Sequence, residues 1–307
     1  MTIEAGPIEP YQPLPRRLTP MTIEELLTRQ FPPREMILAP WLPVKGLAMV
    51  YGPRGVGKTH LALSIAYAAA MGGALFSWRA PKPRKVLYVD GEMPAATLQE
   101  RLAAIILTEG RNPLESDMIR FVCADEEPNG IPDLSTPEGQ AALDEVIEDA
   151  ELIILDNIST LCRSGRENEA ESWNAVQDWA LAKRRDGRAA AFMHHAGKGG
   201  QQRGTSRRED VLDTVVSLRK PQDYNPAEGA RFEIHFEKSR GFTGPEAEPF
   251  EATLTDQGWA TKALSDVLEA RVLALDAEGM KQREIASEVG KSAATVNRIL
   301  KRSRGEL

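Results

Sequence analysis

The sequence predicts an α/β protein whose mainly parallel sheet is flanked by helices, followed by a small all-helical unit. Over most of the chain, short apolar runs alternate with segments that have the apolar period of a helix. From Leu264 onward the pattern is purely helical. Parallel strands need long crossover connections, which helices supply, so this alternation is typical of a sheet covered on both faces.

Short aliphatic runs indicate the parallel strands, and the segments between them indicate the helices. The predicted strands span residues 46–51, 85–90, 119–123, 152–156 and 189–193. The predicted helices span residues 60–71, 95–108, 137–150 and 169–185. Three later runs, at 213–218, 231–238 and 249–255, are expected to extend the sheet as an antiparallel edge.

We divide the chain into three regions. Residues 1–20 contain five prolines and little periodic apolar pattern, so we predict a flexible lead-in there. The α/β domain is expected over residues 21–260, beginning with a short helix and a proline-rich approach. The all-helical domain is expected over residues 261–307.

The composition is ordinary for a soluble globular protein, with 27% charged and 42% hydrophobic residues in a chain of 307. No run approaches the roughly 20 apolar residues of a membrane span, and the N-terminus lacks a basic-then-apolar signal pattern. Cys123 and Cys162 have no CxxC partner, which favours a reducing cytoplasm and argues against structural zinc. We therefore expect a cytoplasmic protein without membrane contact.

The formal net charge of −7 is unfavourable for a nucleic-acid partner, but basic residues cluster locally. Five basic and no acidic residues lie between Lys291 and Arg304, and three arginines lie between Arg203 and Arg208. Charge therefore neither excludes nor establishes DNA binding.

The segment from Gly52 to Thr59 fits the phosphate-loop pattern G-x-x-x-x-G-K-[ST] at every defined position, after a predicted strand and at the start of a helix. Its glycines let backbone N–H groups turn towards phosphate oxygens. Lys58 is expected to reach the β- and γ-phosphates, and the Thr59 hydroxyl to hold Mg²⁺. We therefore expect ATP and Mg²⁺ as ligands. The residues expected around the nucleotide are Gly52, Pro53, Arg54, Gly55, Val56, Gly57, Lys58, Thr59 and His60.

Two carboxylates are expected to complete the site. Asp156 follows four aliphatic residues, and a carboxylate at the end of such a strand can orient the Mg²⁺ shell. Hydrolysis also needs a base to polarise the attacking water. The residue after Asp156 is Asn157, whereas Glu92 lies just past the neighbouring strand. We predict Glu92 as the catalytic base, with Asp90 as the runner-up.

The position of Glu92 resembles that of the catalytic glutamate in the RecA/DnaB group of P-loop ATPases, which implies a RecA-like fold. In the AAA+ class, by contrast, the glutamate directly follows the strand aspartate. The fifth predicted strand ends in His194-His195-Ala-Gly-Lys198, a pattern that resembles plasmid-encoded RepA-type hexameric replicative helicases. A polar side chain at this place can contact the γ-phosphate and report its presence. On this match we favour His195 over His194. The resemblance covers about residues 25–255.

Two later segments resemble parts of these ring ATPases that act across a subunit interface. Residues 202–206 resemble their Arg-Gly-Ser segment, and the strand end around Lys238 resembles their Lys-x-Arg-x-Gly turn. The resemblance implies that Arg203, Lys238 and Arg240 stabilise charge on the neighbouring subunit's γ-phosphate. Which arginine is the finger stays open. Fingers in trans require head-to-tail contact, so the resemblance implies a homo-oligomer, as a ring or hexamer.

The loops at residues 157–170 and 196–210 are where such ATPases usually bind single-stranded DNA. They contain no aromatic residue to stack on bases. The basic residues they offer for phosphate contacts are Arg163, Arg166, Lys198, Arg207 and Arg208.

Residues 282–301 are typical of a helix–turn–helix. Ala286 is a small residue where the two helices cross, Gly290 supplies the turn, and Ser292 can cap the second helix. Lys291 departs from the motif, which usually has an apolar residue there. The expected apolar set is Ile285, Val289, Val296 and Ile299, and the side chains expected to face a major groove are Ala293, Thr295, Asn297 and Arg298. The alternative is a small interaction domain without DNA contact.

The leading hypothesis is an ATP-hydrolysing, DNA-associated oligomeric motor, including a helicase, in plasmid, phage or mobile-element replication. A rival is an ATP-dependent DNA-binding regulator or loader that does not unwind DNA. A third is an ATPase of the ParA partition type, but that loop normally carries an extra early lysine where this chain has Pro53.

Overall fold

The computed structural model describes residues 19–112, 116–163, 169–197 and 210–304. The chain divides into two units, Met1–Arg34 and Glu35–Leu307. The predicted lead-in over residues 1–20 lies almost entirely outside the described residues. In the first unit, helix α1 (Ile23–Thr28) begins at a capping box, in which Thr22 and Glu25 each accept a hydrogen bond from the other's backbone N–H.

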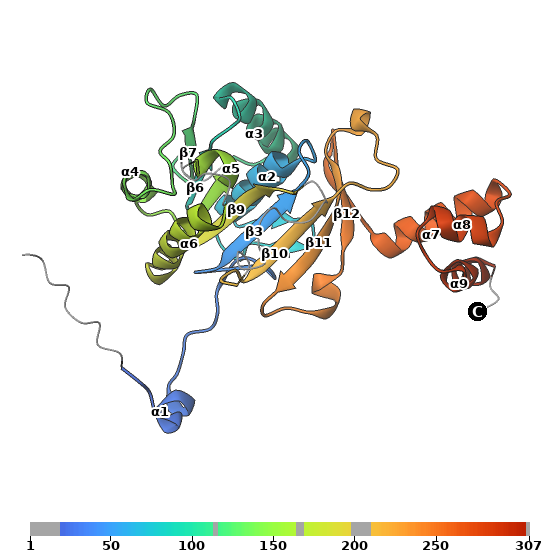
Figure 1. The fold of residues 1–307 in the computed structure, drawn as a ribbon, viewed down its shortest axis with the longest axis horizontal. Coiled ribbons are helices and arrows are strands. Elements are labelled where there is room, and N and C mark those ends of the chain that lie inside the picture. Colours follow the sequence, from blue (N-terminus) through green and yellow to red (C-terminus); the bar gives the residue numbers. More distant parts are fainter. Residues whose placement is uncertain (1–18, 113–115, 164–168, 198–209, 305–307) are drawn as a thin grey trace, which may run out of the picture. The chain divides into compact units, whose positions relative to one another are not determined.

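The second unit is built on a sheet to which the described residues contribute nine strands (Figure 1). The parallel strands are β3 (Leu47–Gly52), β6 (Val86–Asp90), β7 (Ile119–Cys123), β8 (Leu152–Asp156), β9 (Ala189–His195) and β10 (Thr214–Arg219). The antiparallel strands are β11 (Arg231–Ser239), β12 (Phe250–Thr255) and β13 (Gly258–Ala263). Their order across the sheet is β13-β12-β11-β10-β3-β9-β8-β6-β7. The predicted α/β architecture, with its antiparallel edge, is confirmed.

Helices cover both faces of this sheet. Those on one face are α2 (Lys58–Met71) and α3 (Ala95–Glu109), and those on the other are α4 (Pro137–Ile147), α5 (Ile158–Leu161) and α6 (Glu169–Arg185). The alternation along β8 explains the two cores, because Leu152 and Ile154 pack with α2 whereas Ile153 and Leu155 pack with α4 and α6.

Helix α2 is buried on nearly every side. Its sequence is rich in alanine between Ala62 and Ala70, and these small side chains let the helix lie close to the sheet and its other neighbours. The helix therefore has almost no polar face, although it directly follows the glycine-rich loop.

Several elements differ from the sequence prediction. Strand β9 continues two residues past its predicted end and includes His194 and His195, because pairing with β3 extends to Gly52. Strand β13 is absent from the prediction, because exposed polar residues such as Lys262 interrupt its apolar pattern. This strand includes residue 260, where a domain boundary is expected. Elements too short to show a period are β1 (Met36–Leu38), β2 (Leu42–Pro43), β4 (Ala74–Leu75), β5 (Trp78–Arg79), η2 (Pro226–Glu228) and η3 (Gly244–Ala247).

Three helices follow the sheet: α7 (Leu264–Ala277), α8 (Gln282–Glu288) and α9 (Ala293–Ser303). Gly290 has φ +62° in the turn between α8 and α9, and the Ser292 hydroxyl accepts from the Thr295 N–H at 3.2 Å to cap α9. Their buried core consists of Val272, Leu275, Ile285, Ala286, Val296 and Leu300. Among the described residues, no helix has the length and apolar character needed to cross a membrane.

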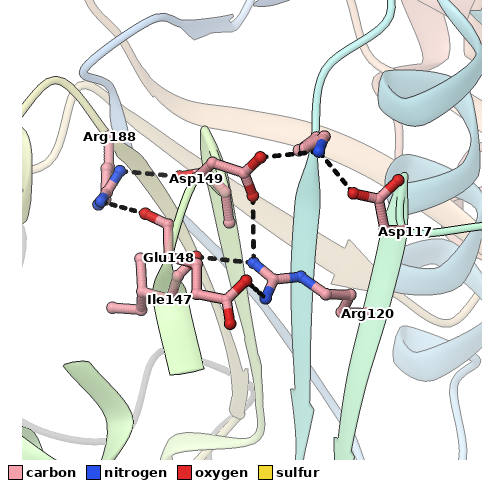
Figure 2. Close-up of polar contacts among 8 residues, drawn as sticks. Asp117, Arg120, Ile147, Glu148, Asp149 and Arg188 are labelled. Atoms are coloured by element: carbon pink, nitrogen blue, oxygen red, sulfur yellow. Dashed lines mark hydrogen bonds and ion pairs between the residues drawn. The ribbon is translucent and has the colours of Figure 1, made fainter. Parts of the chain in front are cut away.

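Charged side chains join the amino-terminal ends of β6, β7 and β8 (Figure 2). Lys85 Nζ lies 2.5 Å from Asp117 Oδ2 and 2.7 Å from Asp149 Oδ2. Arg120 on β7 pairs with Glu148 and, at 3.4 Å, with Asp149. The hydrogen bonds from Lys85 lower the pKa of both Asp117 and Asp149. These pairs link strand ends on the edge of the sheet away from the phosphate loop.

We expect Lys85→Met to lower the free energy of unfolding at pH 7. A carboxylate whose folded pKa is lowered contributes stability above its unfolded pKa of about 3.9, and loses that contribution as the pH falls through the folded pKa. The difference between variant and wild type should therefore shrink towards about pH 3. It should also be modest, because the side chains are partly solvent-exposed. Urea unfolding at both pH values measures this, with Lys301→Met as the control. An equal loss at both values would instead indicate disturbed packing.

Candidate nucleotide site

The phosphate loop joins β3 to α2 at the carboxyl ends of the parallel strands. Gly57 has φ +106°, and a Cβ at this position would lie 2.8 Å from the Cβ of Ala230. A Cβ at Gly52 would lie 2.8 Å from the carbonyl oxygen of Leu218. Glycine is therefore required at both positions. None of the described side chains caps the start of α2, so its first N–H groups are available to an anion.

Lys58 is folded back over its own loop. Its Nζ donates to the carbonyl oxygens of Gly52 at 3.1 Å and Pro53 at 2.8 Å. Burial lowers the pKa of this ammonium to about 8, against the opposing effect of the Asp156 and Glu92 carboxylates. Phosphate oxygens, which carry negative charge, would accept stronger hydrogen bonds from this ammonium than the neutral carbonyl oxygens do.

The parallel register brings the predicted site residues to one edge of the sheet. Asp90 on β6 pairs with Asp156 on β8, and Gly52 on β3 pairs with His195 on β9. Four segments that are far apart in the sequence therefore end side by side, next to the phosphate loop.

Asp156 and Thr59 could hold Mg²⁺. Asp156 is 3% exposed, and its carboxylate accepts from the Tyr88 hydroxyl at 2.8 Å. Burial raises its pKa, while hydrogen bonds from Thr59 and Tyr88 lower it. One carboxylate and one hydroxyl match the protein's usual share of a Mg²⁺ site that substrate phosphates complete. The described residues contain no cluster of three or more acidic, His or Cys side chains that would hold a metal without phosphates.

Glu92 lies on a tight turn directly after β6. Asp90 Oδ1 accepts from the Glu92 N–H at 2.8 Å and also from the Met93 N–H, so Asp90 builds the turn. Asp90 is 1% exposed, and burial raises its pKa to about 6. The Glu92 side chain is 56% exposed, and its carboxylate accepts from Asn157 Nδ2. Glu92 is thus the carboxylate that water can reach, whereas Asp90 is buried and accepts hydrogen bonds from the backbone.

The two histidines at the end of β9 point in opposite directions, because successive side chains of a strand alternate between faces. His195 Nε2 lies 3.5 Å from Glu92 Oε2 and 3.3 Å from Asn157 Nδ2. Burial, together with the Lys58 charge, lowers the pKa of His195, so this imidazole is neutral at neutral pH. His195, and not His194, therefore faces the predicted base.

Lys238 and Arg240 lie at the opposite edge of the sheet. Strand β11 is antiparallel to β10, so its end lies beside Thr214 at the start of β10, which in turn pairs with Ala48 near the start of β3. Lys238 Nζ and Arg240 Nη2 donate to the carbonyl oxygen of Asp210 at 3.4 and 2.9 Å. The structure does not bring these two side chains to the phosphate loop of the same chain.

Other predicted residues lie apart from this cluster. His60 on α2 is partly buried, and burial lowers its pKa to about 4. In the first predicted DNA loop, Arg163 bonds to its own chain, because its guanidinium donates to the Ile131 carbonyl and its N–H to Asp133. The predicted residues outside the described part are Arg166, Lys198, Arg203, Arg207 and Arg208.

Three residues of the site have no role in the sequence prediction. Tyr88 precedes Asp90 by two residues on β6, so it shares a face with Asp90, a signal that strand periodicity contains. The sequence prediction mentions Asn157 only because it follows Asp156, at the position where AAA+ proteins have the catalytic glutamate. Gly91 packs against α5, where a Cβ would lie 2.5 Å from the Thr160 hydroxyl.

Gly91→Ala is expected to displace the turn that carries Glu92 and to lower kcat for nucleotide hydrolysis by roughly ten- to a hundredfold, the usual effect of a misplaced catalytic group. Nucleotide affinity should change little, because the phosphate loop is untouched. Steady-state kinetics and equilibrium binding separate the two effects. The matched control is Gly73→Ala, whose Cβ would have an ordinary 3.9 Å neighbour. A wild-type kcat for Gly91→Ala would contradict this view of the turn.

Comparison with known proteins agrees with this fold. A family model described as an AAA domain (AAA_25) matches residues 12–201. The solved structure of a KaiC-like protein from the hyperthermophilic archaeon Pyrococcus horikoshii OT3 matches with a TM-score of 0.50 and 16% identity, over 72% of this chain and 90% of that one. A search of curated proteins gave no match. Since the family model covers more than half of the sequence, the chain belongs to the AAA_25 family of AAA domains, with the RecA-like P-loop fold described above.

Proposed function

We propose that this chain hydrolyses ATP. The observation that carries the proposal is the convergence of Lys58, Asp156, Glu92 and His195 at the ends of β3, β6, β8 and β9. The loop and α2 offer N–H groups to phosphates, and an accessible carboxylate lies on the same side of the sheet. This is the set of groups that phosphoryl transfer to water needs.

In this mechanism the loop backbone binds the triphosphate, and Lys58 compensates charge on its outer phosphates. Mg²⁺, held by Thr59 and Asp156, would neutralise charge on the β- and γ-phosphates. Water adds in line to the γ-phosphorus and gives a proton to Glu92, while the bond to the β–γ bridging oxygen breaks and ADP leaves. His195 lies beside Glu92 and, being neutral, gives the site a polar ring that can respond to the γ-phosphate without adding positive charge.

We further propose that this ATPase is part of a DNA-associated oligomeric motor similar to RepA-type replicative helicases, in plasmid, phage or mobile-element replication. The position of Lys238 and Arg240 supports assembly, because side chains at the far edge of the sheet can act on a phosphate only in another subunit. Head-to-tail stacking of this kind forms a ring or a filament, and the RepA-type resemblance favours a hexameric ring.

Helices α8 and α9 favour a second candidate, an ATP-dependent DNA-binding regulator or loader. Their glycine turn and capped second helix fit a helix–turn–helix, and α9 carries exposed basic residues at Arg298, Lys301 and Arg302. ATPase rates with and without single-stranded DNA distinguish the candidates. Strong stimulation supports the motor, whereas specific duplex binding without stimulation supports the regulator or loader.

Lys58→Ala is expected to lower the rate of ATP hydrolysis by at least about a hundredfold. The substitution removes the buried positive charge that would stabilise the negative charge developing on the phosphates. Phosphate release measured under saturating ATP checks this. The control is Lys220→Ala, an exposed lysine outside the site, which should keep the wild-type rate. Unchanged hydrolysis by Lys58→Ala would refute the proposed site.

Mixed oligomers test the arginine fingers. Glu92→Gln subunits lack the base but keep Arg240, and Arg240→Ala subunits keep the base. A mixture should therefore hydrolyse ATP faster than the two variants separately, because some interfaces combine an intact base with an intact neighbouring arginine. The same mixture, made with Arg203→Ala in place of Arg240→Ala, shows which of the two arginines acts across the interface. Arg120→Ala, at the same edge but on the far strand β7, is the control and should retain activity alone. Absence of complementation with either arginine variant contradicts the finger assignment.

A further inference from the structure

Asn157 makes three contacts that the roles above do not use. Its Oδ1 accepts from the Ser159 N–H at 3.0 Å and so caps α5. Its Nδ2 donates to Glu92 Oε2 and lies 3.3 Å from His195 Nε2. The residue is only 2% exposed. One buried amide therefore touches the start of a helix, the proposed base and the proposed phosphate sensor.

These contacts determine which way the amide faces. The Ser159 N–H needs an oxygen acceptor, so Oδ1 faces α5 and both protons of Nδ2 face the site. One proton goes to the Glu92 carboxylate, and Nδ2 lies 3.3 Å from His195 Nε2, which can accept the second proton when the ring is in the Nδ1–H tautomer. A proton on that nitrogen would instead face the amide donor at 3.3 Å and the Glu92 carboxylate at 3.5 Å. In the Nδ1–H tautomer the proton of neutral His195 is on a nitrogen that is buried and has no hydrogen-bond partner among the described residues.

The turn that carries Glu92 is held by contacts that do not involve the Asn157 side chain. Asp90 accepts from two backbone N–H groups of the turn, and the Gly91 N–H donates to the Asp156 carbonyl oxygen at 2.8 Å. These bonds place the backbone of Glu92 but not its carboxylate. Among the described residues, the recorded contacts of that carboxylate are with Asn157 and His195.

We infer that Asn157 is a positioning residue. Its two amide protons hold the Glu92 carboxylate and select the Nδ1–H tautomer of His195, and its oxygen anchors the amide to the start of α5. The kinetic part of this inference rests on the proposed ATP hydrolysis. With one Glu92 oxygen held by Asn157, the carboxylate keeps a defined direction for accepting the water proton. The competing role is that of a helix cap alone.

Asn157→Ser separates these roles, because serine caps a helix about as well as asparagine but cannot supply two N–H donors. We expect its thermal stability and ATP affinity to match the wild type. Its kcat should fall at least about tenfold, a part of the roughly 10²- to 10⁴-fold that a positioned base contributes. Asn157→Ala should lose both stability and kcat. Asn225→Ser is the matched control, since Asn225 also caps a short helix, through the Ala227 N–H at 3.0 Å, and should keep the wild-type kcat. A wild-type kcat for Asn157→Ser overturns the inference.

Nitrogen-15 NMR of the histidine rings tests the contact without turnover, in nucleotide-free protein at pH 8. His195 is assigned by comparison with His195→Gln. The wild-type ring should show the Nδ1–H tautomer, and Asn157→Asp should move the proton to Nε2, because a carboxylate accepts where the amide donates. An unchanged tautomer in Asn157→Asp overturns the inference. If wild-type protein hydrolyses no ATP, the proposed function fails, but the tautomer shift still supports or overturns the contact.

Discussion

The parallel register of the central strands is the constraint on which the whole site depends. Neighbouring strands lie about 4.8 Å apart, so residues paired at the ends of parallel strands have side chains within reach of one another. The pairs Asp90 with Asp156 and Gly52 with His195 follow directly from this register. A slip of one residue in any of these strands would turn its side chains to the other face and disperse the site. The two hydrophobic cores that fix the register therefore also fix the chemistry.

The electrostatics of the site point towards a ligand. Burial lowers the pKa of Lys58 to about 8 and raises that of Asp90 to about 6, so the protein alone disfavours charge in this place. A triphosphate would bring negative charge to the lysine, and its divalent cation would bring positive charge to the carboxylates. The cost of burying these groups in the folded protein is then partly recovered when the proposed ligands bind.

Much of the architecture and part of the site follow from local features of the sequence. The aliphatic runs of β3, β6 and β8, the glycine-rich loop and the carboxylates at the strand ends each carry their own signal. Strand β13 could not be predicted, because its side chains are mostly exposed and polar, and its existence depends on pairing with β12. The contacts of Tyr88 and Asn157 depend on how β6, β8 and β9 align, and on side-chain direction. Local sequence patterns do not contain the alignment of these strands.

The burial of α2 has a mechanical consequence. A helix enclosed by neighbours on nearly every side cannot rotate or slide without opening gaps in the core, and close-packed cores resist such gaps. The N-terminal end of α2, where the phosphates would bind, is therefore a stationary wall of the site. Any response to the presence or loss of the terminal phosphate would then arise on the other side of the site, where the Glu92 side chain is 56% exposed. The site would thus have one rigid side that binds and one adaptable side that signals.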